Sequence, residues 1–406
     1  MTNAHLLIDD GVCELRAVAL VGGAVRRFFF YPNGTVKPQP AHEFFEGDIV
    51  VGQIKAIVPE YGGAFVEIGD SQPAFLAKRR AQSPLVEGEK QLFRIRSRRR
   101  QSKGVDLDGD WRAGLTAEGI QRILSSDRST PGKVSVANTP VLACLRYFSD
   151  MQISKLTVGS ARLATDVAAS LDGQYNAEQR VDETLVWTDE VEEALDCSLL
   201  RQVKYKKAVI SFDEVQAGTV IDIDGAGDGT PPGAASQFND RVNGDAITFL
   251  AGELDRRGIG GQIMIDFLPP STPSAFGAFK TRVAQMGRVV DVNRDGFVRL
   301  IRPRRVASLW VVATDLAPLS ANDVSPKRYV TASWLLREAV RRLEMRLRRQ
   351  ANTRFELILS DTLLDTCELP ELRSALDAKY GARHSIRTVE SGERLAVGGA
   401  YEIIER

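Results

Sequence analysis

The stretch AGTVIDIDGAGDG, residues 217–229, places three aspartates directly after a short apolar run. Alternation of apolar and polar residues predicts the end of a β-strand, with Asp222 and Asp224 on one face. Carboxylates that lie this close repel each other unless a cation lies between them. The stretch is therefore either half of a metal site or an acidic turn, and Asp228 with the glycine after it is typical of a second turn.

The residues that follow predict a partner for this strand end. A helix is expected over 240–257, with Asn239 as its N-cap, and the strand QIMIDF (262–267) comes next with Asp266 near its end. The two strands of such a strand-helix-strand unit usually neighbour each other in one sheet. Their ends then lie within about 5–10 Å, so the three carboxylates are expected to converge.

Converging carboxylates are hard oxygen ligands, which suit Mg²⁺, with Mn²⁺ as the alternative. An ion held by Asp222 and Asp266 would activate water and stabilise the charge of an attack on a phosphodiester. An acid inside IMIDFL favours this interpretation, because a buried strand rarely carries a carboxylate unless it is at the end or paired. On these residues alone the acidic turn remains the alternative.

The bulk composition is that of a soluble globular protein. The chain has 406 residues, enough for two or three domains, with 43% hydrophobic and 26% charged residues. No run of about 20 apolar residues is present, so no membrane-spanning segment is expected. The first residues, MTNAHLLIDDGV, carry acids where a signal peptide needs a basic region, which favours a cytoplasmic protein.

Cysteine, histidine and charge counts narrow the chemistry further. Four cysteines lie far apart without a CxxC pair, which argues against a disulfide framework or a cysteine zinc site. Only three histidines are present, so imidazole catalysis has few candidates. The net charge is zero, from 53 basic and 53 acidic residues, but arginines cluster in FRIRSRRRQSKG (93–104). That cluster favours a polyanionic partner.

The remaining pattern indicates several domains. Residues 1–40 alternate like a β-hairpin or meander, with Asn33-Gly34 as the expected turn. Short strands separated by Gly, Pro and Asp over 46–80 indicate a small barrel. Residues 139–171 predict a helix, a strand and a second helix. A strongly basic helix over 331–350 would face RNA, a partner subunit or solvent.

With both acidic strand ends in view, the chain resembles the ribonuclease E/G family over most of its length. In that family an IDxN strand end precedes a helix, and a Gly-Gly-apolar-IDF strand follows. The matching stretches here are VIDID (220–224) and GGQIMIDF (260–267). The resemblance implies that Asp222 and Asp266 bind magnesium. Asp224 departs from the family pattern, because it stands where the family has an asparagine that assists at the metal.

The resemblance also implies an α+β multidomain fold. It predicts an S1-like OB-fold β-barrel inserted in an RNase H-like subdomain, then a DNase I-like α/β catalytic subdomain and a small α/β C-terminal domain. The expected bounds are 1–40 plus 136–200 for the RNase H-like subdomain, 41–104 for the S1-like RNA-binding barrel, 105–135 for a shortened 5′-sensor region, 201–312 for the catalytic subdomain and 328–406 for the C-terminal domain.

Residues for RNA binding follow from the same resemblance. Phe65 and Phe75 match the family's base-contacting aromatics, while Arg100 and Lys103 fall on basic positions near the RNA. Aromatic faces and cations together suit single-stranded RNA. The alternative that both rings belong to the barrel core remains open. Arg288 matches a family arginine and is expected to steady the phosphate or orient the carboxylates.

Three departures qualify the resemblance. Residues 305–325 contain no cysteine, so the family's zinc-link between domains is not expected, and a homodimer would need another surface. Only about 30 residues, 105–135, remain where the family has its 5′-sensor, with Thr116 as a remnant. Preference for 5′-monophosphorylated RNA is therefore expected to be weakened or lost. Arg299 stands where the family has an acid.

Two functions remain from this sequence. The first is a metal-dependent endoribonuclease that cleaves single-stranded RNA in RNA processing or decay. The alternative is an RNA-binding or scaffold protein that keeps the fold and has lost the chemistry, which Asp224, the missing zinc-link and the shortened 5′-sensor favour. The two metal aspartates favour the enzyme, because repelling acids bring no benefit to a chain without catalysis. A small-molecule phosphoesterase would leave the arginine cluster and the barrel aromatics without a role.

Overall fold

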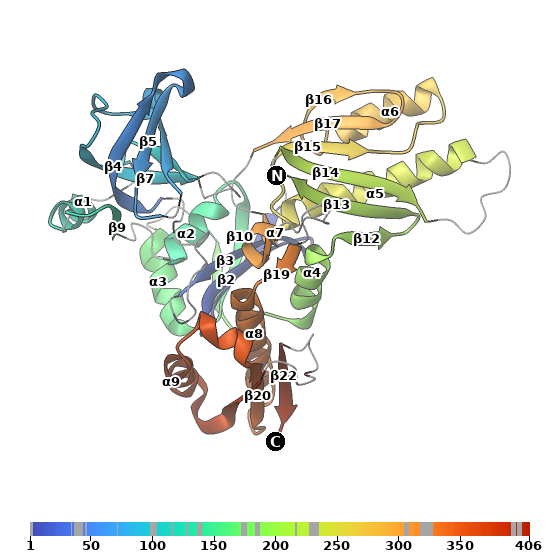
Figure 1. The fold of residues 1–406 in the computed structure, drawn as a ribbon. Coiled ribbons are helices and arrows are strands. Elements are labelled where there is room, and N and C mark those ends of the chain that lie inside the picture. Colours follow the sequence, from blue (N-terminus) through green and yellow to red (C-terminus); the bar gives the residue numbers. More distant parts are fainter. Residues whose placement is uncertain are drawn as a thin grey trace. The chain divides into compact units, whose positions relative to one another are not determined.

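The protein is a mixed α+β chain in the computed structural model (Figure 1). The structure describes residues 3–406 apart from 34, 36–43, 45–46, 71, 98–103, 114, 116, 127–128, 136–139, 172–176, 183–186, 216, 227–234, 304–307, 317–327, 391–394 and 396–399. Contacts divide the chain into two units. The first unit holds Met1–Ala17, Phe29–Thr188 and Val311–Arg406, and the second holds Val18–Phe28 and Asp189–Trp310.

A five-stranded sheet is built from residues on both sides of the barrel sequence. Its order is β11-β10-β1-β2-β3, and β1 pairs with β10, and β10 with β11, in parallel. The strands are β1 (Asn3–Asp10), β2 (Glu14–Val21), β3 (Ala24–Pro32), β10 (Gln152–Val158) and β11 (Glu178–Val181). The helices α2 (Pro140–Tyr147) and α3 (Ala161–Leu171) flank β10 in the chain, as predicted over 139–171.

The first hairpin turns at a different place from the one predicted. β2 and β3 neighbour each other and are joined only by Gly22 and Gly23, whose φ angles are 60° and 83°. Such left-handed φ angles in a two-residue connection suit glycine at both positions. The hairpin turn predicted at Asn33-Gly34 is wrong, because β3 ends at Pro32 and the next strand, β4 (Ile49–Val58), belongs to another sheet. Gly34 itself lies outside the described residues.

A closed five-stranded barrel follows β3, as expected from the short strands. Its order is β5-β6-β8-β7-β4, and β4 also pairs with β5, which closes it. The strands are β4 (Ile49–Val58), β5 (Gly63–Glu67), β6 (Ala74–Ala77), β7 (Lys90–Ser97) and β8 (Asp106–Asp108). Alternate residues fill its interior, among them Ile54, Val66, Leu76 and Phe93. The closed barrel fits the OB-like fold that the sequence predicted.

Residues after 104 also belong to this barrel region. β8 supplies one of the five closing strands, and β9 (Gly132–Ser135) pairs with β4 outside the closed set. The short helix α1 (Ala117–Leu124) buries Ile123 against Trp111 and Ile49. The stretch 105–135 therefore folds onto the barrel.

The second unit contains a six-stranded sheet with two helices on one face (Figure 1). Its order is β12-β13-β14-β15-β17-β16. The elements are α4 (Asp189–Leu199), β12 (Gln202–Tyr205), β13 (Ala208–Val215), β14 (Gly218–Gly225), α5 (Ala235–Arg256), β15 (Gly261–Asp266), α6 (Pro273–Val283), β16 (Arg288–Val292) and β17 (Phe297–Arg302). Ile221 and Ile263 pack against Val242 and Leu250 of α5 and Phe279 of α6.

The unit β14-α5-β15 has the predicted arrangement. β14 and β15 pair in parallel and are direct neighbours, so the expected strand-helix-strand unit is confirmed. The predicted N-cap is wrong, because α5 already begins at Ala235 and Asn239 lies inside the helix. The Asn239 side-chain amide donates to the carbonyl oxygen of Pro269, at 3.2 Å. A tertiary contact thus uses the polar group that the sequence assigned to a cap.

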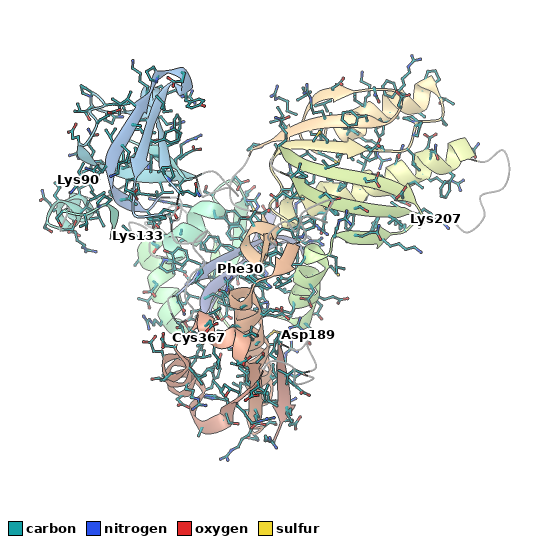
Figure 2. All side chains as sticks on the ribbon, viewed as in Figure 1. Phe30, Lys90, Lys133, Asp189, Lys207 and Cys367 are labelled. Atoms are coloured by element: carbon teal, nitrogen blue, oxygen red, sulfur yellow. The ribbon has the colours of Figure 1, made fainter. Side chains whose placement is uncertain are left out.

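The C-terminal residues form a three-stranded sheet, β21-β20-β22, with two helices. Preceding and flanking elements are α7 (Leu309–Ala313), β18 (Thr314–Leu316), β19 (Arg328–Val330), α8 (Ala332–Arg349), β20 (Phe355–Ser360), α9 (Leu369–Tyr380), β21 (His384–Val389) and β22 (Tyr401–Glu405). Thr331 caps α8 by accepting from the Trp334 amide. The rings of Trp334 and Phe30, the latter labelled in Figure 2, meet edge to face at 5.2 Å between centroids.

Buried charges join α8 to the first two strands. Glu14 of β2 accepts from Arg337 and Arg341 of α8 at 3.2 and 3.1 Å, and all three side chains are at most 2% exposed. In a second group, Asp9 pairs with Arg16 and Arg348, and Arg16 also pairs with Glu344. Asp9, Arg16 and Glu344 are buried, and Arg348 is partly buried. We call these seven residues the α8 ion-pair network.

The network corrects the expectation for the basic helix. Arg337 and Arg341 were expected to face RNA, a partner subunit or solvent, but they point into the first unit and are neutralised by Glu14. None of the three expected environments therefore applies to these two arginines. Arg349 at the end of the same helix is exposed.

The helices do not include a membrane span, and the cysteines do not form disulfides, among the residues that the structure describes. Among the described residues, no helix combines the length and apolar character needed to cross a bilayer. All four cysteines are free thiols, and three of them, Cys13, Cys144 and Cys367, are buried. Cys367, labelled in Figure 2, belongs to the core around α8.

Glu14→Gln is expected to destabilise the protein by about 3 kcal/mol, because it removes the buried negative charge that pairs with both Arg337 and Arg341. The measurement is the free energy of unfolding from urea titration. Glu178→Gln is the matched control, since Glu178 is an exposed carboxylate on β11 of the same sheet, and it should change stability by less than about 0.5 kcal/mol. Equal stability of the two variants would contradict the structural role of the network.

Candidate metal and RNA site

The two predicted metal aspartates are direct neighbours across a strand pair. In the parallel pairing of β14 with β15, Asp222 is the register partner of Asp266, at the last paired position. Register partners on adjacent strands have side chains that project from the same face of the sheet. The backbone thus brings together two carboxylates that are 44 positions apart in the sequence.

Alternation explains why the carboxylates lie on the open face. Ile221 and Ile223 of β14 are buried against the helices, while Asp222 and Asp224 between and after them are exposed. On β15, Ile265 is buried and Asp266 is exposed. The face opposite to α5 and α6 therefore carries three carboxylates near the ends of two adjacent strands.

The electrostatics of Asp222 show that these carboxylates affect one another. Partial burial and the negative charges of Asp224, Asp266 and Asp213 raise the pKa of Asp222 above its ordinary value of 3.8. Asp213 already has a partner, because Arg201 holds it with two hydrogen bonds of 2.8 and 2.9 Å. The repulsion at Asp222 is the condition that a bound cation would relieve.

The donor set fits a hydrated magnesium ion better than a metal held by protein atoms alone. In the part of the chain that the structure describes, no three Asp, Glu, His or Cys side chains are close enough to hold a metal ion together. Mg²⁺ commonly uses only one or two carboxylates and keeps several waters or substrate phosphates as its other ligands. Asp222 and Asp266 can supply such a pair, with Asp224 beside them.

Two residues that the sequence analysis did not place at the site lie next to Asp266. Phe297 of β17 is the register partner of Asp266, and its side chain is 37% exposed. Arg299, two residues on, pairs with Met264 and so lies diagonally from Asp266 on the same face, about 7–8 Å away at the backbone. The alternation in FVRLIR (297–302) was the signal that would have put Phe297 and Arg299 on one face.

Arg288 lies away from the paired carboxylates. It begins β16, which is separated from β15 by β17, and its register partner is Ile301. Ile301 in turn pairs with Gln262, four residues before Asp266 along β15. At about 3.3 Å per residue, this offset is about 13 Å along the strands. The register therefore does not bring the Arg288 backbone to the two carboxylates, and its catalytic role stays a prediction.

The barrel aromatics are outside the barrel core. Phe65 and Phe75 are register partners on β5 and β6, with their ring centroids 5.7 Å apart. Their chain neighbours Val66 and Leu76 point inward and are fully buried, whereas both rings are partly exposed. The alternative that these two rings fill the core is wrong. Their contact with RNA stays a prediction.

Several predicted residues fall outside the described parts of the chain. These are Arg100 and Lys103 of the basic stretch, Thr116 of the shortened sensor region and Asp228 of the acidic turn. Their assigned roles stay predictions.

A protein-family model matches about half of the chain. Residues 83–276 match the model of the Ribonuclease E/G family. The matched range contains Asp222, Asp224 and Asp266, and it begins after Phe65 and Phe75 and ends before Arg288. None of the curated proteins searched matches the chain.

The pKa of Asp222 can be measured by carboxyl-carbon NMR in the absence of divalent cations. We expect its titration midpoint above 3.8, and lower midpoints in Asp224→Asn and Asp266→Asn, because each removes a repelling charge. Since a raised pKa means that ionised Asp222 destabilises the fold, Asp222→Asn should gain a few tenths of a kcal/mol at pH 7. This gain should vanish as the pH falls below 3.8.

Glu178→Gln, an exposed carboxylate on β11 of the five-stranded sheet, is the control for this titration. It should leave the Asp222 midpoint unchanged. A midpoint at or below 3.8 in the wild-type protein would contradict the clustering of the three carboxylates.

Proposed function

Because residues 83–276 match the model of the Ribonuclease E/G family, we propose that the protein is a metal-dependent endoribonuclease that cleaves single-stranded RNA in RNA processing or decay. This match supports a ribonuclease-related function and an RNA substrate. The observation that carries the finer proposal is the register pairing of Asp222 with Asp266 inside the matched range.

The proposed roles follow from the open face of the sheet. Asp222 and Asp266 would hold Mg²⁺, or Mn²⁺ in its place, and the ion when bound supplies Lewis-acid stabilisation of phosphate charge and an activated water. Asp224 adds charge on the same face and orients groups beside the pair. The three carboxylates end their strands on a face without covering helices, which leaves room for a polynucleotide.

RNA binding is proposed for the outer surface of the barrel. Phe65 and Phe75 offer adjacent rings on which bases stack, and the basic stretch with Arg100 and Lys103 supplies charge for phosphates. Arg288 is proposed to contact the strand away from the reacting phosphate, because its place on β16 is distant from Asp266.

A second candidate function is RNA binding without cleavage. The observation that favours it is Asp224, which replaces a neutral side chain with a third negative charge and contributes to the raised pKa of Asp222. An ionised carboxylate only accepts hydrogen bonds, so Asp224 cannot donate to a water or phosphate oxygen as an amide side chain can. The experiment below separates this scaffold from the enzyme.

Cleavage should depend on the carboxylate pair and on divalent metal. A short AU-rich single-stranded RNA should be cut in Mg²⁺ and not in EDTA. Asp222→Asn and Asp266→Asn should each lower the rate by more than about 100-fold, because changes that only surround a metal already cost 10–100-fold. Both variants should still bind the RNA in EDTA, since they keep the barrel.

Asp291→Asn is the matched control, because Asp291 is an exposed carboxylate of β16 on the same sheet. It should cleave at the wild-type rate. Binding of RNA by the wild-type protein without cleavage in Mg²⁺ or Mn²⁺ would overturn the enzyme and leave the scaffold. Cleavage that persists in EDTA would overturn the metal dependence.

The 5′ end of the substrate should have little effect on the rate. Residues 105–135, where the family has its 5′-sensor, form strands and a helix of the barrel region. RNAs with a 5′-monophosphate and a 5′-hydroxyl should therefore be cleaved at rates within about tenfold of each other. A specific charged contact to the phosphate would be worth about 1.5–3 kcal/mol, a preference of more than tenfold. Such a preference would contradict this prediction.

A further inference from the structure

Tyr61 is an aromatic side chain of the barrel that is exposed to solvent. It is 70% exposed, although large apolar side chains usually bury most of their area. It ends the short 3₁₀ turn η2 (Pro59–Tyr61) that joins β4 to β5. The Tyr61 hydroxyl and ring therefore stand on the outer surface of the barrel, at the start of the strand that carries Phe65.

The ring of Tyr61 continues the pair formed by Phe65 and Phe75. Its centroid lies 6.4 Å from that of Phe65, with 72° between the ring planes. Phe65 and Phe75 are 5.7 Å apart at 65°. The three rings thus form one row, Tyr61-Phe65-Phe75, which we call the ring row.

Two glycines position this row. Gly62 follows Tyr61 with a φ of 66°, and its amide donates to the carbonyl oxygen of Pro59, which closes the turn. At Gly63 a Cβ atom would lie 2.6 Å from Cζ of Phe75 and 2.3 Å from the carbonyl oxygen of Leu76. Only glycine fits there, so the backbone after Tyr61 packs directly under the Phe75 ring.

Exposed cations lie next to the ring row in the backbone. The Lys78 amide donates to the carbonyl oxygen of Gly62 at 2.8 Å, so the turn η3 (Lys78–Arg80) adjoins the Tyr61 turn. Lys78 and Arg79 are exposed, and within the described residues neither has an acidic partner, whereas Arg80 pairs with Asp108. Open aromatic rings with unpaired cations beside them suit a polynucleotide better than an apolar protein surface.

We propose that Tyr61 is a third base-stacking position of the barrel, so that single-stranded RNA binds along the whole ring row with Lys78 and Arg79 at its phosphates. This inference rests on the proposed function, because it takes RNA as the ligand of Phe65 and Phe75. The ring spacings of 5.7 and 6.4 Å exceed the spacing of about 3.4 Å between stacked bases of one duplex strand. Bases on the row must therefore be unstacked from one another, which selects single strands.

The test is the affinity of a fluorescent single-stranded oligonucleotide RNA, measured by anisotropy in EDTA so that nothing is cleaved. Tyr61→Ala should weaken binding by about five- to twentyfold, the loss of one stacked base. Tyr61→Phe keeps the ring face and should bind like the wild type. Val181→Ala is the matched control, because Val181 is an exposed apolar residue on another sheet of the same unit.

Stacking and charge can be separated with two further measurements. An abasic oligomer of the same length has the phosphates without the bases, so Tyr61→Ala should bind it as the wild type does. Lys78→Ala should reduce the slope of log affinity against log salt by about 0.7, the value for one phosphate contact to a single strand, and Tyr61→Ala should leave the slope unchanged.

Phe65→Ala distinguishes failure of the inference from failure of the proposed function. If Phe65→Ala weakens binding and Tyr61→Ala does not, the third position is wrong and RNA binding at the barrel stands. If Tyr61→Ala weakens abasic and normal RNA equally, stacking at Tyr61 is wrong. If the wild-type protein neither binds nor cleaves RNA, the proposed function falls and the inference falls with it.

Discussion

The α8 ion-pair network is the constraint on which the first unit depends. Moving an ion from water into a protein interior costs several kcal/mol, and attraction offsets this cost only when the ion has a well-placed partner of opposite charge. In the network, each of the three carboxylates, Asp9, Glu14 and Glu344, pairs with at least one of the four arginines, and most of these pairs join β1 or β2 to α8. Burial alone would raise the pKa of Asp9, but the charges of Arg16 and Arg348 outweigh it and lower the pKa of Asp9 to about 2. Neither the strands nor the helix can form this interior without the other.

The carboxylates of β14 and β15 show the opposite arrangement. Asp9 is surrounded by arginines and ionises readily, whereas Asp222 is surrounded by acids and its pKa is raised. The protein thus pairs its acids where they stabilise the fold and keeps like charges together on the open face of the six-stranded sheet. A site of this kind gains stability when a cation binds, and that gain is available for binding a phosphate as well.

The parts of the structure that the sequence predicted correctly follow from rules that relate residues close together in the chain. Alternation and the strand-helix-strand rule were enough to place Asp222 beside Asp266, because both rules act within about 50 residues. The direction of the basic helix was not predictable, since the spacing of its arginines is the same for a buried and a solvated face. Its partner Glu14 is 327 residues from Arg341. The prediction that Asn239 caps a helix was wrong for the same reason. The side-chain amide of Asn239 donates to the carbonyl oxygen of Pro269, which is 30 residues away.

The long span of the network has a consequence for synthesis of the chain. Arg16 and its partner Glu344 are separated by 328 positions. A ribosome that adds about 5–20 residues per second needs roughly 15–65 s to cover that distance. During this interval Asp9 and Arg16 can pair with each other, whereas Glu14 lacks its partners Arg337 and Arg341, so the interior between the N-terminal strands and α8 cannot form before α8 emerges. The barrel, whose closing strands lie within residues 49–108, has no such delay and can fold first.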